Sequence, residues 1–134
     1  MSFRPFSLIL LMMCMLSSAY AEPQDKNALQ GRWQATEATS NGEAPPAGLL
    51  EKLSLVFTND MVIIMGAPLT RFTIDTNFTP ARIDILNSRR QVGIYELKGD
   101  TLKLCVGMDG DRPKSFRTQK YTDHTYMLLK RVKD

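Results

Sequence analysis

A predicted β-hairpin centred on Gly99-Asp100 limits the fold of this chain more than any other sequence feature. Apolar and polar residues alternate from Gln91 to Val106, and a period of two indicates strands that bury one face. Gly99-Asp100, at the middle of this segment, is typical of a two-residue hairpin turn with glycine first. Folding about the turn sets apolar residues opposite each other on one face and Glu96 opposite Lys103 on the other. The two faces therefore predict the same antiparallel register.

The same alternation predicts six further strands, which are separated by turns and loops instead of crossover helices. Asn59-Asp60 tolerates the backbone angles of a tight turn and predicts a second hairpin, with Phe57 opposite Val62. Sequential strands joined in this way form antiparallel meanders, and eight of them commonly close into a barrel. The expected fold class is mainly β, a small antiparallel eight-stranded barrel with one short helix at Ala47 to Lys52. The six further strands are expected at 29–36, 53–58, 61–65, 69–75, 81–87 and 125–132.

The N-terminal segment has the three-part layout of a cleavable secretory signal. Arg4 precedes an apolar run at 6–16, and Ala19-Tyr20-Ala21 supplies small residues for signal peptidase. The run is roughly 11 residues long, whereas a membrane-spanning helix needs about 20. We expect cleavage after Ala21 and export to the periplasm or the medium. Cys14 offers a lipoprotein anchor as the alternative, but two methionines precede it where small residues are required.

The chain that remains after cleavage has the size of one ordinary domain, about 113 residues. The formal charge is +3 for the whole chain and one less without Arg4, and it forms no basic stripe, which argues against nucleic acid as a partner. Cys105 is left without a second cysteine, so the fold must hold without an internal disulfide. No later apolar run is long enough to span a bilayer, and we expect a monomer. The expected division is a signal peptide at 1–21, a disordered lead-in at 22–28 and a β-barrel domain at 29–134.

Five motifs, in order along the mature chain, are similar to the pattern of one family. They are Leu29-Gln30-Gly31-Arg32-Trp33, Asn41-Gly42, Gly93-Ile94-Tyr95 with Gly99-Asp100-Thr101-Leu102-Lys103-Leu104-Cys105, Arg112-Pro113 with Ser115-Phe116, and Leu128-Leu129-Lys130-Arg131. The first and last resemble the calycin pattern of lipocalins and fatty-acid-binding proteins, in which a Gly-x-Trp tryptophan stacks on a basic residue of the last strand. More closely, the chain resembles a lipocalin-like domain found mainly in exported proteins of planctomycete bacteria, a family without an assigned activity. The resemblance implies a lipocalin-like (calycin-like) barrel with a structural clamp between Trp33 and Arg131, and it implies no catalytic residues.

An eight-stranded barrel is just wide enough to be filled by its own side chains or to hold one small ligand. The large residues expected to point inward are Trp33, Phe57, Ile64, Phe72, Ile85, Tyr95, Leu104 and Tyr126. Four of these are the candidate contacts for a small apolar ligand in the interior: Phe57, Phe72, Tyr95 and Tyr126.

The sequence lacks a recognisable set of catalytic residues. His124 next to Asp123 could form a base oriented by a carboxylate, but no nucleophile accompanies it. Cys105 lies in the middle of a predicted strand, where a cysteine packs as a small apolar residue. Asp109-Gly110-Asp111 lacks the further acidic ligand of a calcium loop, and one histidine with one cysteine cannot complete a transition-metal site. We therefore expect no enzyme, no cofactor and no metal.

Basic residues gather in two predicted loops, as Arg89-Arg90 and as the group Arg112, Lys114 and Arg117. They could meet an anionic head group, a glycan or a partner protein at one rim of the barrel, although solvated loop charges need no ligand. The function expected from the sequence is an exported, non-enzymatic binding module for a small hydrophobic ligand or for a macromolecule held by its loops. The alternative is a structural or protein-interaction domain with a filled interior. The volume of that interior distinguishes the two.

Overall fold

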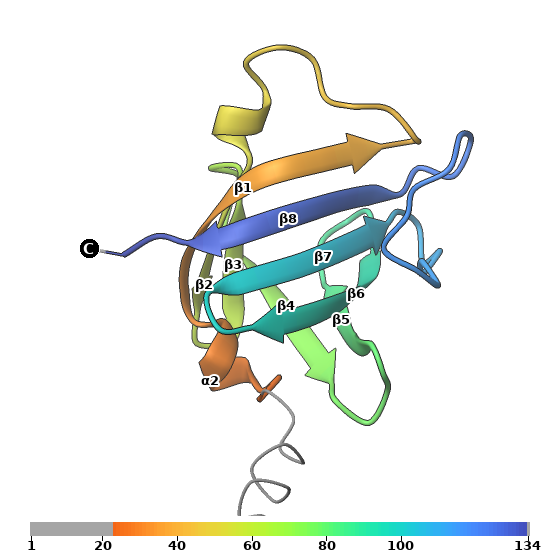
Figure 1. Cartoon of the computed structure of the whole chain (residues 1–134). Helices are drawn as coiled ribbons and strands as arrows, with labels where there is room; N and C mark the ends of the chain where they lie inside the picture. Colours follow the sequence, from red (N-terminus) through yellow and green to blue (C-terminus); the bar gives the residue numbers. More distant parts are fainter. Residues whose placement is uncertain (1–22, 134) are drawn as a thin grey trace, which may run out of the picture.

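The eight strands form a closed antiparallel barrel (Figure 1). The structure is a computed structural model that describes residues 23–133, and the expected signal peptide at 1–21 and its cleavage site lie outside this part. Each strand pairs with the next, and β1 closes the barrel against β8. The expected fold class is therefore confirmed. The strands are β1 Gly31–Ser40, β2 Ser54–Thr58, β3 Met61–Ile64, β4 Thr70–Asp75, β5 Ala81–Ile85, β6 Gln91–Lys98, β7 Thr101–Gly107 and β8 Thr125–Arg131.

Both hairpins form in the register expected from the sequence. Glu96 lies opposite Lys103 in the β6–β7 pair, and Phe57 lies opposite Val62 in the β2–β3 pair. Asn59, in the turn of the second hairpin, has the positive φ of 56° that a tight turn requires. In each hairpin the turn residues and the alternation agree, so segments close in sequence determine the pairing.

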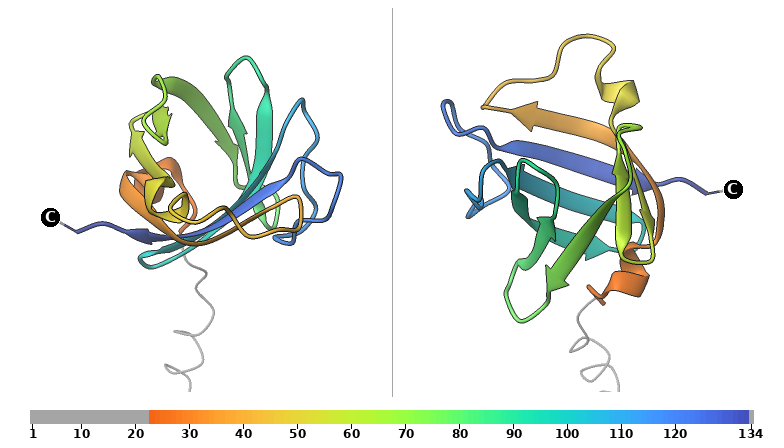
Figure 2. Two further views of the ribbon diagram at one scale, coloured as in Figure 1. Left: turned by 90° about the horizontal axis from the view of Figure 1, so that it is seen from above. Right: turned by 180° about the vertical axis from the view of Figure 1, so that it is seen from behind.

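The two ends of the barrel differ in their connections. The turns after β2 and β6 have two residues each and the turn after β4 spans 76–80, and we call this side the turn end. The connections after β1, β3, β5 and β7 lie at the opposite, loop end. Figure 1 shows β1, β8 and β7 in front of β2, β3 and β4, with the short helix α2 (Lys26–Leu29) below them. Although the β4–β5 turn and the connection after β7 follow opposite ends of their strands, Figures 1 and 2 show them on the same side of the molecule, and residues of both line one pocket. The loop-end connections are 41–53, 65–69, 86–90 and 108–124.

The barrel interior is occupied by its own side chains. Trp33, Tyr95 and Phe72 are the largest of them, and all three are buried. The rings of Phe57 and Phe72 meet edge to face with their centroids 5.0 Å apart. Burial of each large apolar side chain contributes about 1.5 to 3 kcal/mol to folding. The other members of this single core are Leu29, Ala35, Leu53, Leu55, Val62, Ala81, Ile83, Ile85, Leu97, Leu102, Leu104, Val106, Met127 and Leu129.

A second apolar layer lies outside β6 and β7, where the loop at 108–124 covers them. Ile94 and Cys105 are neighbours on these two strands, and both are buried although they face away from the interior. Pro113 of the loop is buried and lines one pocket together with Ile94. Residues on both faces of β6 and β7 are therefore removed from water, which explains why these strands carry apolar residues on both sides.

The N-terminal lead-in at 22–28 differs from the disordered segment that we expected. Its described part is ordered, because Asp25 caps α2 (Lys26–Leu29) by accepting a backbone hydrogen bond of 2.9 Å. The side-chain amide of Gln24 bonds both backbone groups of Leu97, with distances of 2.7 and 2.8 Å. β6 continues beyond the pairing with β5 at this point, so Leu97 offers an open strand edge that the amide occupies.

The helix expected at Ala47 to Lys52 is a single turn of 3-10 helix, η1 (Leu50–Lys52). The Gln34 side chain on β1 donates to the carbonyl oxygens of Leu50 and Leu53 at 3.2 Å. The turn does not continue as a helix, because the next residue, Leu53, is extended and enters the core. Within residues 23–133 the α-helix is α2, at the turn end.

Candidate functional site

A largely apolar pocket of about 540 Å³ opens at the loop end, between the connections after β3 and β5. Its apolar wall comes from the end of β3 and the loop that follows: Ile64, Met65, Ala67, Pro68 and Leu69. Asn87, Ser88 and Gln91 form the polar wall opposite. Pockets that bind small molecules are commonly about 300 to 1,000 Å³ and are lined by apolar residues with a few polar groups. The volume and the lining of this pocket fit that description.

The pocket exists because β3 and β4 separate at the loop end. The two strands pair only between residues 61–62 of β3 and 70–71 of β4. The chain then turns at Met65 and Gly66, which have positive φ angles of 52° and 72°. Pro68 has no N–H group with which to extend the ladder back toward β3. The space beside the end of β3 is therefore left to the pocket.

Three large apolar side chains at the loop end are exposed to solvent. Met65 is 46% exposed, Leu69 is 51% exposed, and Leu86, which precedes the polar wall, is 53% exposed. Single exposed apolar residues are ordinary, but a group of them around a pocket is typical of a binding surface.

The polar wall is positioned by its own hydrogen bonds. Asn87 donates from Nδ2 to Oε1 of Gln91 over 2.6 Å, and its Oδ1 accepts from the backbone N–H of Arg89 over 3.2 Å. A ligand that meets these groups does not have to order them first, which lowers the entropic cost of binding.

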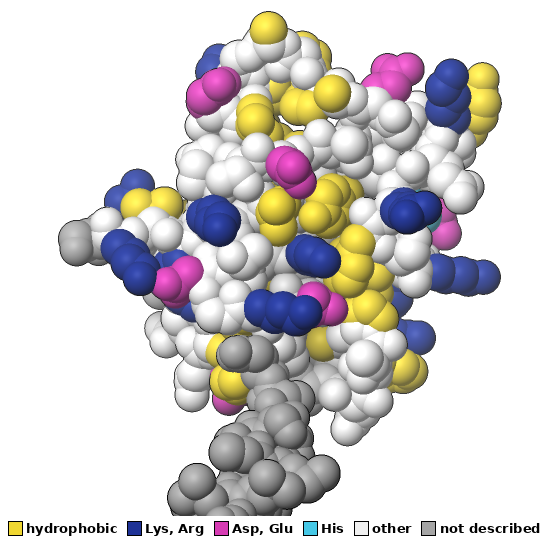
Figure 3. All heavy atoms as spheres, in the orientation of Figure 1, with side chains coloured by type: hydrophobic (Ala, Val, Ile, Leu, Met, Phe, Trp, Pro, Cys, Tyr) yellow, Lys and Arg dark blue, Asp and Glu magenta, His cyan; other side chains and the backbone are white. Residues whose placement is uncertain are grey.

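A second pocket, of about 410 Å³, lies beneath the loop after β1 and shares Met65 with the first. Pro45, Pro46 and Leu49 contribute much of its apolar lining. Figure 3 shows hydrophobic side chains around a hollow at the top of the molecule, where Figure 1 places this loop. Because the two pockets meet at Met65, we describe them together as the loop-end groove.

Three of the four aromatic residues that the sequence analysis assigned to ligand binding lie in the packed core. Phe57, Phe72 and Tyr95 are buried, and the loop-end groove is lined by other residues. Tyr95 donates its hydroxyl hydrogen bond to the backbone carbonyl of Gln24. Burial, and then the nearby charge of Asp25, raise the pKa of Tyr95 to about 12. Its hydroxyl therefore stays protonated and holds the lead-in against β6.

Tyr126 faces outward, so the expectation that it lines the interior is wrong. The buried residues of β8 are Met127 and Leu129, and Tyr126 packs against a phenylalanine of the loop after β7. β8 carries apolar residues on both faces, so alternation alone does not decide which face turns inward. Arg131 decides which face of β8 turns inward. Its side chain reaches the indole ring of Trp33 in the interior, so Leu129, two residues earlier, also faces inward.

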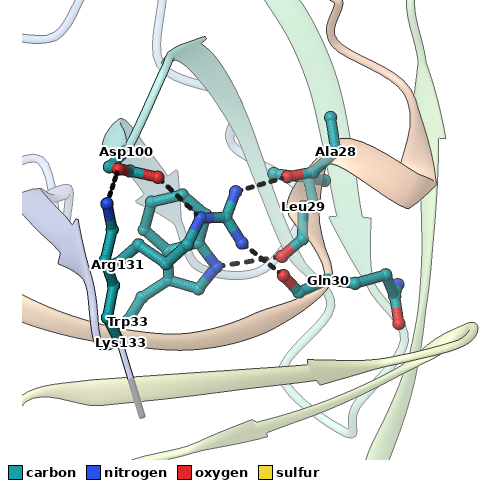
Figure 4. Close-up of polar contacts among 7 residues, drawn as sticks. All are labelled: Ala28, Leu29, Gln30, Trp33, Asp100, Arg131 and Lys133. Carbon is teal, nitrogen blue, oxygen red and sulfur yellow. Dashed lines mark hydrogen bonds and ion pairs between the residues drawn. The ribbon is translucent and has the colours of Figure 1, made fainter.

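Trp33 and Arg131 meet at the turn end, as the calycin-like pattern predicts (Figure 4). The guanidinium carbon lies 4.3 Å from the centroid of the indole ring, close enough for a cation–π interaction. Arg131 also donates to the carbonyl oxygens on either side of Leu29, at 2.5 and 2.9 Å, and to Asp100 at 3.1 Å. The indole N–H donates to the carbonyl of Leu29 over 2.9 Å. The clamp thus ties α2 to the first and last strands.

Cys105 is buried on the outer side of β7, and this burial raises the pKa of its thiol to about 11. The thiolate is the nucleophilic form of cysteine, and it is scarce at neutral pH when the pKa is this high. The position of Cys105 therefore fits packing rather than catalysis.

We expect the Cys105 thiol of the folded protein to resist a thiol-reactive reagent at about pH 8 and to react fully in denaturant. The folded pKa lies above the ordinary value of about 8.5, so the unfolded state loses its proton first. Stability is therefore expected to fall as the pH rises from about 8.5 through the folded pKa of about 11. A Cys105→Ala variant, measured by urea unfolding over this pH range, should show a smaller decline. Rapid labelling of the native protein would contradict this account of the thiol.

His124 pairs with Asp111 instead of with its neighbour Asp123. Its Nε2 lies 3.0 Å from Oδ2 of Asp111, which joins the start of β8 to the other end of the loop after β7. Asp109 pairs in turn with Arg89 at 3.6 Å. In the part of the chain that the structure describes, no three His, Cys, Asp or Glu side chains are grouped as a metal site would need.

Arg112 does not reach the rim of the barrel, where a partner was considered for the basic loop residues. It crosses the outer wall and donates to the carbonyl of Gly93 over 2.8 Å and to Asp84 over 2.7 Å. A backbone carbonyl group of the sheet and one carboxylate therefore hold the Arg112 guanidinium in place. Because Arg112 belongs to the loop after β7, these contacts also fix that loop against the barrel.

In comparisons with known proteins, no family model matches the chain, and no curated protein or solved structure is significantly similar to it. The structure places the chain among small antiparallel β-barrels with an apolar groove at the loop end. Among residues 23–133 there is no helix with the length and apolar character needed to cross a membrane.

Proposed function

We propose that this protein is an exported, non-enzymatic binding module that holds a small apolar molecule in the loop-end groove. The observation that carries the proposal is the apolar pocket of about 540 Å³, with Met65 and Leu69 exposed on its rim. Covering apolar surface in water is favourable by about 25 cal/mol per Å². Asn87 and Gln91 on the opposite wall offer polar groups that orient a ligand with one polar end.

The groove is better suited to a ligand than the interior of the barrel. Trp33, Phe72 and Tyr95 occupy the interior, and protein cores pack as densely as organic crystals. A ligand in the interior would have to displace these side chains, whereas in the groove it displaces only water. The proposal therefore replaces the interior aromatic residues with the groove residues as the ligand contacts.

Export, a monomeric state and the family relationship belong to the same proposal. The layout of residues 1–21 supports export to the periplasm or the medium. The five motifs in order, the closed barrel and the clamp of Trp33 with Arg131 support the resemblance to the lipocalin-like domain of exported planctomycete proteins.

A protein-interaction domain is the second candidate, and the filled interior favours it. In this case an apolar side chain of a partner protein would occupy the same groove beside Met65. Native mass spectrometry of the protein from the exported fraction of its own host separates the two candidates. A small molecule bound one to one, identified after organic extraction, supports the first, and a bound protein without a small molecule supports the second.

A Leu69→Gln variant tests the groove directly, with the uncharged fluorescent dye Nile red as the probe. Replacing one leucine that packs against a ligand removes about 1.5 kcal/mol, which corresponds to roughly tenfold weaker binding. Because Leu69 is 51% exposed, the melting temperature is expected to change little. Fluorescence titration gives the affinity, and circular dichroism gives the melting temperature.

Val132→Gln is the matched control, because Val132 is also an exposed apolar residue but lies at the turn end. It should leave the affinity for Nile red unchanged. Equal affinities of the two variants, or a probe that binds only when the core residue Phe72 is shortened to alanine, would contradict the groove as the binding site.

A further inference from the structure

A separate pocket, of about 360 Å³, lies on the outer wall of the barrel. It is formed between the β4–β5 turn and the loop after β7, which Figures 1 and 2 show on the same side of the molecule. It shares no lining residue with the loop-end groove, so it is a different site from the one in the proposed function. We call it the outer-wall pocket, and the residues that matter are Phe78, Arg82, Ile94, Arg112, Pro113 and Lys114.

The outer-wall pocket carries positive charge that its own lining does not balance. Arg82, Arg112 and Lys114 line it, and none of its lining residues is acidic. The positive charge of Arg112 is neutralised by an ion pair with Asp84, at 2.7 Å. The ion pairs within residues 23–133 include neither Arg82 nor Lys114. A concave site with two unpaired cations attracts an anion.

Arg82 is held over an aromatic ring although an acidic residue lies directly across the sheet. Asp75 of β4 is its partner in the ladder, yet that carboxylate accepts from the backbone of Asn77 over 2.9 Å and forms no ion pair with Arg82. The guanidinium carbon of Arg82 lies 3.5 Å from the centroid of the Phe78 ring. A planar guanidinium stacked in this way keeps its N–H groups at its edge, where a carboxylate can accept two parallel hydrogen bonds.

The wall that carries Lys114 is anchored before any ligand binds. Arg112 donates from one nitrogen to the carbonyl oxygens of Gly93 and Ile83, at 2.8 and 3.3 Å, and the next residue, Pro113, is buried. These contacts hold the backbone of Lys114 at the edge of the pocket. A supported wall of this kind keeps the ammonium group near the place that an anion would occupy.

The pocket lining beside the cations is apolar. Phe78 is 42% exposed, and Ile94 and Pro113 line the pocket next to it. We propose that the outer-wall pocket binds a small aromatic carboxylate. Its ring packs against Phe78 and Pro113, and its carboxylate accepts hydrogen bonds from Arg82 and Lys114. The site neither requires nor excludes a ligand in the loop-end groove.

Naphthoate is the probe, with the uncharged naphthalene methanol as its matched analogue. We expect naphthoate to shift the backbone amide signals of the non-proline residues within 78–82 and 112–114 in an NMR titration of the whole mature protein. Loss of one charge-assisted pair should weaken binding roughly tenfold in Arg82→Gln, with a similar effect in Lys114→Gln. Naphthalene methanol should bind at least about tenfold more weakly than naphthoate. Arg71→Gln, which changes an exposed arginine of β4 paired with Asp60, should bind as the wild type does.

Three outcomes would overturn the proposal. The first is that naphthoate shifts only signals from residues 65–69 and 87–91, which would move its binding to the loop-end groove. The second is that the uncharged analogue binds as tightly as naphthoate, and the third is that Arg82→Gln binds as the wild type does. If Arg82→Gln does not fold, Lys114→Gln decides, because Lys114 is exposed and contributes no core contact. Failure of Nile red to bind the groove leaves these measurements unaffected, so the two proposals fail independently.

Discussion

A Trp33→Ala variant is expected to lose about 3 to 5 kcal/mol of its free energy of unfolding. The side chain is the largest in the core and is fully buried, so its removal leaves a cavity at the turn end. The same change removes the surface under the Arg131 guanidinium and the hydrogen bond to the carbonyl of Leu29. A small domain has about 5 to 15 kcal/mol of stability in total, so this loss is a large share of it. Urea unfolding followed by circular dichroism measures the change.

Two milder variants separate the parts of the clamp. Trp33→Phe keeps an aromatic ring under Arg131 but cannot donate to Leu29, and Arg131→Lys keeps the charge but not the fork that reaches two carbonyl oxygens. Each is expected to lose about 1 to 3 kcal/mol. A Trp33→Ala variant that keeps the melting temperature of the wild type would show that the clamp does not hold the fold together.

A Gly93→Ala variant is expected to lose about 3 kcal/mol, because β6 and β7 lie too close together for a methyl group at this position. An added Cβ would lie 2.4 Å from the carbonyl oxygen of Cys105 and 2.8 Å from Cγ1 of Val106. The first contact is with backbone, which no side-chain rotation relieves, so the ladder itself must open. The carbonyl of Gly93 also accepts from Arg112, and the shift should loosen the loop after β7 as well.

Gly99→Ala is the control variant, because it replaces a glycine by alanine at a position where the added Cβ has no steric clash. Gly99 has a positive φ of 56°, and an added Cβ would meet nothing within 4 Å. Its expected cost is about 1 kcal/mol, which comes from the left-handed backbone alone. Gly93 needs no such backbone angle, so a larger loss in Gly93→Ala measures the close approach of the strands. Equal losses in the two variants, compared by urea unfolding, would contradict that explanation.

The orientation of β8 shows how far alternation alone can predict a barrel. Tyr126 and Met127 are both apolar enough to line the interior, and the interpretation that placed Tyr126 inside was wrong. The sequence contains the feature that decides between Tyr126 and Met127. A clamp of Trp33 with Arg131 requires Arg131, and every second residue before it, to face inward. Combining the clamp with the alternation places Leu129 and Met127 in the core.

The two candidate sites were beyond the reach of sequence patterns. The sequence pattern predicts that Met65 and Leu69 end strands, and their exposure follows from the separation of β3 and β4 near the loop end. No sequence pattern points to Phe78 and Arg82, because nothing near them in the sequence indicates that Lys114 folds back to the same pocket. Each pocket is assembled from segments that are far apart along the chain.

The turn residues and the side-chain alternation determined the strand order and the two hairpins, and the resemblance to the calycin pattern pointed to Trp33 and Arg131 as a clamp. Turn residues and side-chain alternation act between neighbours, so their energetics can be read within a short window. The tertiary structure alone decided which residues of β8 face inward, where the loop at 108–124 lies, and where Met65 and Arg82 meet a pocket. These features depend on contacts made only when the barrel closes, because closure brings together surfaces whose burial no local pattern specifies.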